Sequence, residues 1–349
     1  MSEFTPLAAG RHIASILWFP FLFAIALPLI FELAFHAPQP HQVPIAVVGS
    51  GSQVEAISNE LQAVNSGGFR VEQVRSEPAA ESAVRDRDVA AAILERAPSP
   101  PVLYVAKAAS SIRASYLQGV FTQLALDART SPPQLVDVVP LLPGDSGNAV
   151  FFFVFPMLMV GIITVLVLLQ RAQKWSIEHR ALAVVGMGAV GAVAAYVTVV
   201  NLNALPDKPA LLLYAFFLSQ VIGQLLLGAA PILKQYFLPI AMTFSLVVGV
   251  PSAGGTVPPD LLPVGLRYLS DVLPLAQGVR VARSVAYFHG ADLLAPTMIL
   301  VAWAVVALIG LAFVRYRGKP SDDTRSDGVT ATDQLTMPSL SVEGTETVT

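Results

Sequence analysis

Two glutamine side chains stand one helical turn apart in an otherwise apolar stretch of this 349-residue chain. Gln220 and Gln224 would share one face of a helix, because residues i and i+4 are neighbours on its surface. Inside a bilayer such amides need hydrogen-bonding partners. The pair could line the path of a polar substrate. More commonly, such a pair holds two helices together. Interhelical hydrogen bonds of this kind are frequent but weak, contributing only about 0.6 kcal/mol each on average.

Two arginines form a second candidate site. Arg280 and Arg283 are three residues apart in an amphipathic stretch at 275–288, which predicts a helix along the membrane interface. The simplest interpretation is that both guanidinium groups anchor the chain to lipid phosphates. The alternatives are contact with an anionic substrate, or an ion pair with the domain formed by residues 38–147.

Glycine and proline interrupt the chain ahead of these arginines. The interrupting residues Gly254, Gly255, Pro263 and Pro274 follow the end of an apolar run. Non-helical backbone at membrane depth is tolerated only where protein or a water-filled cavity satisfies its polar groups. Residues 254–290 are therefore predicted to form a re-entrant or interfacial segment that acts as an outer gate.

The sequence carries no recognisable catalytic or cofactor-binding pattern. It has no cysteine, and its five histidines are not spaced as metal ligands. The Gly49–Gly51 turn lacks the spacing of a dinucleotide-binding motif, and the chain has no ATP-binding phosphate loop. Basic residues do not alternate with aromatic ones, so nucleic acid is not an expected partner. We therefore expect no enzyme activity, no cofactor and no metal.

Long uncharged runs dominate the chain. Charged residues make up 13% of it, against about 25% in an average soluble domain, which indicates an integral membrane protein. The first run exceeds the roughly 7–15 residues of a signal-peptide core, so we interpret it as an uncleaved helix. In the third run, Gly188 and Ala192 have the small-residue spacing that allows close helix contact. The predicted spans are 13–35, 149–169, 181–205, 210–233, 236–253 and 293–314.

Residues 38–147 differ from the rest, because charges of both signs return and no run is long enough to cross a bilayer. Alternating strand and helix patterns predict a small α/β domain, with Ser52 capping its first helix. The predicted fold is a six-helix membrane protein, with this extracytoplasmic domain inserted between helices 1 and 2 and a re-entrant/interfacial segment before helix 6. We expect strands at 45–48, 69–74, 89–94, 102–105 and near 136–139, and helices at 54–64, 78–87 and 110–128.

Positive charges predict the orientation. With the N-terminus inside, eight lysines and arginines of the short segments lie on the cytoplasmic side and four on the outer side. This places both termini, residues 1–12 and 315–349, in the cytoplasm. The tail is rich in Ser, Thr, Asp and Glu, which predicts disorder. The inner set is Arg11, Arg171, Lys174, Arg180, Lys234, Arg315, Arg317 and Lys319, and the outer set is Lys208, Arg267, Arg280 and Arg283.

Two stretches carry a resemblance to a known family. Residues 138–170 (VVPLLPGDSGNAVFFFVFPMLMVGIITVLVLLQ) lead from the extracytoplasmic domain into the second span. Residues 262–290 (LPVGLRYLSDVLPLAQGVRVARSVAYFHG) hold two Leu-Pro pairs followed by Arg280. With the order of the spans, they make the chain similar to the ABC type 2 exporter permease superfamily, closest to its YhgE/phage infection protein-like branch.

The resemblance implies a permease subunit of the bacterial inner membrane, which forms a homodimer and exports a lipid, polymer or other amphiphile. It also implies a separate ATPase subunit, which could contact the short basic loop with Arg171, Lys174 and Arg180. Residues 1–12 depart from the family pattern, because they are too short for its usual interface helix. The alternative is a non-transporting envelope receptor or scaffold whose extracytoplasmic domain binds partners. An intramembrane enzyme is a remote option, since the spans lack paired carboxylates.

Overall fold

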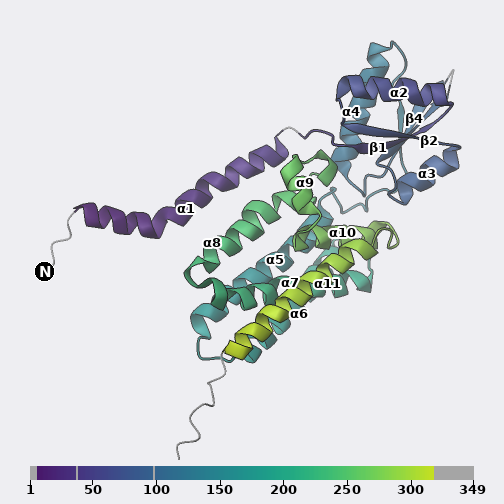
Figure 1. Ribbon diagram of the computed structural model, residues 1–349. Helices are drawn as coiled ribbons and strands as arrows, with labels where there is room; N and C mark the ends of the chain where they lie inside the picture. The colour runs from purple at the N-terminus through teal and green to yellow at the C-terminus, as the bar shows by residue number, and fades with distance from the viewer. Residues whose placement is uncertain (1–5, 37, 97–98, 318–349) are drawn as a thin grey trace, which may run out of the picture.

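The computed structural model describes residues 6–36, 38–96 and 99–317 (Figure 1). Helix α1 (Pro6–Phe35) begins before the predicted start of the first span, so part of the stretch expected as a polar N-terminal segment is helical. Both Pro20 and Pro28 lie inside this continuous helix. The predicted disordered tail lies outside the described residues from position 318 onward.

The predicted α/β domain forms one five-stranded sheet. The strand order is β2-β1-β3-β4-β5, and β4 runs antiparallel to β3 while the other pairs are parallel. Helices α2 and α4 pack on one face of the sheet and α3 on the other, each with its own cluster of buried side chains. The strands are β1 (Val43–Val48), β2 (Phe69–Val74), β3 (Ala91–Arg96), β4 (Ser99–Val105) and β5 (Gln134–Asp137); the helices are α2 (Gly51–Val64), α3 (Glu77–Arg85) and α4 (Ser111–Asp127).

Polar side chains begin the helices of this domain. Ser76 and Ser110 accept hydrogen bonds from backbone N–H groups in the first turns of α3 and α4. The predicted cap of α2 at Ser52 is wrong, because the helix begins at Gly51 and its cap is Ser50. The backbone N–H of Ser50 donates to Oε1 of Gln53 at 2.7 Å, so the first turn already includes Ser52.

Among the described residues, five helical stretches are long and apolar enough to cross a membrane. They make the chain a helical membrane protein with a small α/β domain. The first is the apolar part of α1, Leu17–Phe35, and the second and third are α5 (Ala149–Arg171) and α6 (Ile177–Asn201). The last is α11 (Leu294–Arg317).

The fourth stretch, Pro209–Gly249, has 41 residues and joins two of the six predicted spans. It contains α7 (Pro209–Leu233), the 3-10 turn η1 (Lys234–Tyr236), α8 (Phe237–Met242) and the π-helix η2 (Thr243–Gly249). Lys234 separates α7 from the rest, because its φ of 51° lies in the left-handed region. In Figure 1 the chain turns between α7 and α8, and α8 leads up towards α9 (Val264–Ser270).

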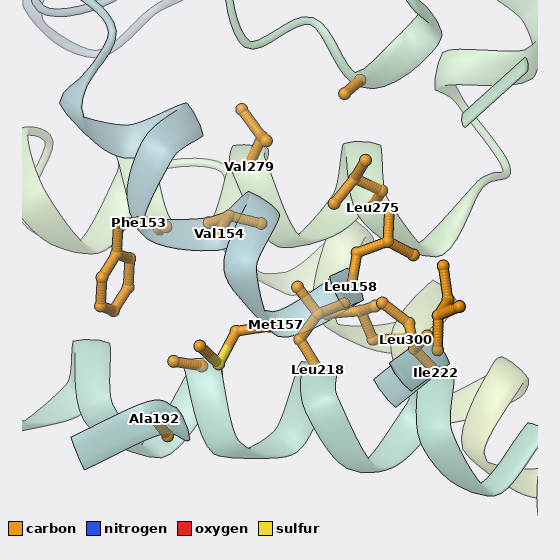
Figure 2. Close-up of a cluster of buried hydrophobic side chains, with 14 of the residues drawn as sticks. Phe153, Val154, Met157, Leu158, Ala192, Leu218, Ile222, Leu275, Val279 and Leu300 are labelled. Carbon is orange, nitrogen blue, oxygen red and sulfur yellow. The ribbon is translucent and has the colours of Figure 1, made fainter. Parts of the chain in front are cut away.

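The bundle has one large apolar core. Side chains of α5, α6, α7 and α11 meet there with those of α10 (Pro274–Tyr287), as Figure 2 shows for Phe153, Met157, Leu218 and Leu275. Two short 3-10 turns, η3 (Pro251–Ala253) and η4 (Pro259–Leu261), lie between the π-helix and α9. Helix α1 stands apart from this core in Figure 1, and only 6% of its apolar window is buried.

Candidate functional site

Helix α10 runs antiparallel to the first half of α7. Its last turn lies beside the start of α7, where Nζ of Lys208 donates hydrogen bonds to the carbonyl oxygens of Val285 and Ala286 at 2.9 and 3.1 Å. Its first turn lies beside the middle of α7, because Leu275 and Ile222 line the same small cavity. At a rise of 1.5 Å per residue, α10 extends about 20 Å along the bundle. The turn that precedes α10 therefore lies about 20 Å along the bundle from the start of α7.

Protein groups satisfy the backbone of this deep turn. Nε2 of Gln277 donates to the carbonyl of Ser270 at 2.8 Å, and both residues are fully buried. The indole N–H of Trp303 on α11 donates to the carbonyl of Val272, also at 2.8 Å. A buried carbonyl without such a partner would cost about 1–3 kcal/mol. Gln277 and Trp303 therefore explain how the chain can reverse direction at this depth.

An ion pair lies at the same turn. NH2 of Arg280 is 2.6 Å from Oδ1 of Asp271, and it also donates to Oγ of Ser270 at 3.4 Å. The side chains of Arg280 and Asp271 are 27% and 55% exposed, so the pair faces outward from the bundle. Of the two predicted arginines, Arg280 thus contacts its own hairpin and keeps an accessible side.

Arg283 has a different environment. It is 7% exposed and donates to the carbonyl oxygens of Gly254 and Gly255 at 3.3 and 3.2 Å. These contacts differ from the expected anchoring to lipid phosphate, because the guanidinium is enclosed by protein. A Cβ atom on Gly255 would lie 2.6 Å from Cγ of Phe151, so the glycine allows the chain to approach α5 closely. Gly254 has a φ of 67°, which favours glycine.

The two predicted prolines begin the helices of the hairpin. Pro263 is the residue before α9, and Pro274 is the first residue of α10. Proline suits these positions because its missing N–H would have no partner inside the helix. The structure thus brings the predicted gate residues into one segment, with Arg283 joining its start to its end.

The outer segment also joins the α/β domain. Arg113 on α4 forms an ion pair with Asp260 at 2.9 Å, with both side chains under 20% exposed. Arg267 donates to the carbonyl of His41, and the N–H of His41 donates to the carbonyl of Asp260. Leu261 is fully buried in the same cluster as α2 and α4. The ion pair between segment and domain thus joins Arg113 and Asp260, whereas Arg280 and Arg283, the arginines considered for such a pair, contact residues of the segment itself.

A second contact on the other face of the sheet strengthens this junction. The guanidinium of Arg87 lies 5.2 Å from the ring centroid of Phe288, within the range of a cation–π interaction. Burial lowers the pKa of Arg87 from its ordinary value. Phe288 belongs to the apolar cluster beneath α3, so both faces of the domain contact the outer segment.

Asp145 is a residue that the sequence interpretation missed. Its Oδ1 accepts the backbone N–H groups of Gly147 and Ala149 at 2.7 and 3.0 Å, at the start of α5. Its Oδ2 accepts the hydroxyl of Tyr287 at 2.6 Å. Asp145 therefore ties the end of α10 to the start of α5. An aspartate just before a long apolar run is a helix-start signal that could have identified it.

Gln220 and Gln224 contact each other and a neighbouring helix. Nε2 of Gln224 donates to the carbonyl of Ala181 on α6 at 3.1 Å and lies 3.3 Å from Oε1 of Gln220. Nε2 of Gln220 donates to Oγ of Ser219 and lies against Gly188, whose missing side chain leaves room for it. This geometry is that of interhelical hydrogen bonding. A cavity of about 20 Å³ on another side of α7 is lined by Ile222, Leu225 and Leu226, and by neither glutamine.

The basic loop between α5 and α6 is partly used within the protein. Arg180 donates to the carbonyls of Ala172 and Gln173 at 3.1 and 2.7 Å, which holds the loop closed. Arg171 and Lys174 are exposed, and Lys174 lines an open depression of about 650 Å³. The predicted coupling loop therefore divides into one structural arginine and two accessible charges.

The described residues contain no group of three or more His, Asp or Glu side chains that could hold a metal ion. Comparisons with protein-family models, with curated proteins and with solved structures found no match for this chain. The resemblance to ABC type 2 permeases thus remains a prediction.

Proposed function

We propose that this protein is a permease-type membrane subunit that moves an amphiphile across or out of the bilayer. The observation that carries the proposal is the Asp271–Arg280 ion pair, which lies deep along the bundle and faces outward. A charged side chain at the centre of a membrane costs about 2.5–3.5 kcal/mol and usually marks a transport or ion path. A helical anchor for a receptor would have no need of such a pair.

In this proposal the chain crosses the membrane six times. The 41 residues from Pro209 to Gly249 would extend about 60 Å as one helix, twice the thickness of the bilayer core. The left-handed residue Lys234 supports two crossings with a turn between them. The hairpin α9–α10 then enters from the outer side and returns to it, as a gate that separates the moving amphiphile from the outside. Both termini lie in the cytoplasm of a bacterial cell.

The energy source in this proposal is a separate ATPase subunit, and the working form is a homodimer. The exposed Arg171 and Lys174 supply a basic surface at the cytoplasmic end, where an acidic partner surface could bind. This part depends on the family resemblance. A receptor or scaffold is the alternative. It is favoured by the apolar cluster in which the α/β domain packs against the outer segment.

Copurification tests the proposal for a substrate of any identity. The protein would be extracted from its native membrane in mild detergent, and bound lipids and proteins identified by mass spectrometry. We expect one amphiphile enriched over the bulk lipids, together with a nucleotide-binding subunit. The double variant Asp271→Asn/Arg280→Gln should lose the enriched amphiphile by about tenfold, because the deep charges are gone.

A matched control exists in the second ion pair of the bundle. Glu178 at the start of α6 and Arg315 near the end of α11 lie 3.1 Å apart, and both side chains are more than half exposed. The variant Glu178→Gln/Arg315→Gln should retain the amphiphile. Equal loss in both variants, or no enrichment in the unmodified protein, would overturn the transport proposal. Binding of an envelope protein that persists in both would favour the receptor.

A further inference from the structure

The α/β domain contains a cavity of about 220 Å³ that the transport proposal does not use. It lies between α2 and α4, above β3 and β4. The buried side chains of Ile57, Ile93 and Phe121 form its apolar part. Glu60 and Glu95 stand at its rim and are exposed. The cavity is smaller than the roughly 300–1,000 Å³ of sites for drug-sized ligands, so it suits a small molecule or a single side chain.

The cavity opens on the side of the domain that is farthest from the bundle. The start of β1 lies close to His41, which contacts the outer segment through Asp260. Because β3 is parallel to β1, the end of β3 with Glu95 points the opposite way. Strand β2 lies on one side of β1 in the sheet, and β3 lies on the other side. The C-terminal ends of β1 and β3 therefore form a topological switch point. Ligands of open α/β sheets bind at such points.

Gln53 fixes the carboxylate of Glu95 at this point. Its Nε2 donates to Oε2 of Glu95 at 3.0 Å, while its Oε1 accepts the backbone N–H of Ser50. The amide thus links the first turn of α2 to the end of β3. Glu95 therefore presents its carboxylate at the cavity rim in a fixed position.

Arg96, the residue after Glu95, forms an ion pair on the opposite face of the sheet and does not reach the cavity rim. Glu95 and Arg96 contact helices on opposite faces of the sheet, Glu95 with Gln53 of α2 and Arg96 with Glu77 of α3. Arg96 forms an ion pair with Glu77 beneath the sheet, where Tyr104 also donates to that carboxylate. Hydrogen bonds from Tyr104 and then Arg96 lower the pKa of Glu77. None of the described residues that line the cavity is Lys or Arg, which leaves its rim with negative charge only.

We propose that this cavity binds a small organic cation, a primary ammonium group on a short aliphatic or aromatic body. The ammonium would pair with Glu60 and Glu95, and the apolar body would contact Ile57, Ile93 and Phe121. A matched anion of the same shape would be repelled by the same carboxylates. This site is independent of the transport proposal, since it lies outside the bundle and its hairpin.

The lack of cysteine allows a direct test on the full-length protein. Ala128 is an exposed residue that lines the cavity, so Ala128→Cys supplies a single reporter thiol at the rim. Its rate of reaction with a neutral methanethiosulfonate would be measured with hexylamine and with hexanoate. We expect hexylamine to slow the reaction by about fivefold, as about 80% occupancy of the site would. Hexanoate should leave the rate unchanged.

Two further variants connect the protection to the carboxylates. Adding Glu60→Gln, alone or with Glu95→Gln, should abolish protection by hexylamine, and Glu55→Gln, on the same helix but outside the cavity, should retain it. A reporter at Asn59→Cys, an exposed position of α2 outside the cavity, should show no protection. The site is disproved if hexylamine gives no protection, if hexanoate protects equally, or if protection survives Glu60→Gln with the thermal unfolding of the variants unchanged.

Discussion

The stretch Leu17–Phe35 of α1 is strongly apolar and almost wholly outside the protein core, whereas α10 carries two arginines and a glutamine and is almost wholly buried. The apolar window of α1 has a mean hydropathy of 2.1, yet only 6% of it is buried. In α10, Gln277 and Ser284 are fully buried and Arg283 nearly so. Burial of these two helices is therefore opposite to what the water solubility of their side chains would suggest.

The contrast follows from the solvent. Lipid tails are as apolar as leucine, so an apolar helix gains little by leaving lipid for protein. Polar groups gain much more, because only protein can supply their hydrogen bonds at that depth. Acceptors are present for the donors of α10: the carbonyls of Gly254 and Gly255 for Arg283, and that of Ser270 for Nε2 of Gln277, whose Oε1 is left without a partner. The hydrogen bonds of its polar residues thus help to hold α10 inside the bundle.

The largest effect is expected at Arg283. Arg283→Leu keeps apolar volume but leaves the carbonyls of Gly254 and Gly255 without their donor. Each buried unsatisfied group costs about 1–3 kcal/mol, so the free energy of unfolding should fall by about 2–6 kcal/mol for the two carbonyls. Unfolding of the purified protein in detergent measures this change. The control Arg171→Leu, on an exposed side chain, should stay within about 0.5 kcal/mol. Similar losses in both would contradict the role of Arg283 as an internal donor.

A smaller effect is expected from steric substitution within the same segment. A methyl group added by Gly255→Ala would overlap the ring of Phe151, which should cost about 1–3 kcal/mol. The matched variant is Gly265→Ala in α9, where no atom lies within 4 Å of the added carbon. This variant should be neutral or stabilising by up to about 1 kcal/mol, since alanine stabilises a helix more than glycine does. The midpoints of thermal unfolding would show the difference, and equal shifts would argue against close packing at Gly255.

Local patterns allowed much of the α/β domain to be predicted. The bounds of β2 coincide with the predicted strand at 69–74, because alternation with period two is visible in the sequence itself. Helix α4 likewise lies within the predicted range and is capped by Ser110, the first residue of that range. These elements depend on neighbours along the chain, so one sequence is enough to find them.

The environment of α10 could not be predicted in this way. An amphipathic pattern such as that of residues 275–288 is the same whether its polar face meets lipid headgroups, as the interfacial interpretation requires, or buried carbonyls. The difference arises from Trp303, Asp145 and Lys208, which approach from distant parts of the chain. The break between the predicted spans 210–233 and 236–253 was visible by contrast, because Lys234 is a charge in an apolar run, and the structure shows a φ of 51° at this residue.

The smallest effect is expected on the exposed face of α1. Leu29 and Leu33 are 56% and 59% exposed, and lipid covers such side chains before and after unfolding in a membrane. Leu29→Ala/Leu33→Ala should therefore change the free energy of unfolding of the reconstituted single chain by less than about 0.5 kcal/mol. A loss above about 1 kcal/mol that grows with the protein-to-lipid ratio would show instead that a second copy covers this face, because binding to the folded state raises apparent stability by mass action. That outcome would restrict the contrast between α1 and α10 to the isolated chain, while the requirement of α10 for internal hydrogen-bonding partners would still hold.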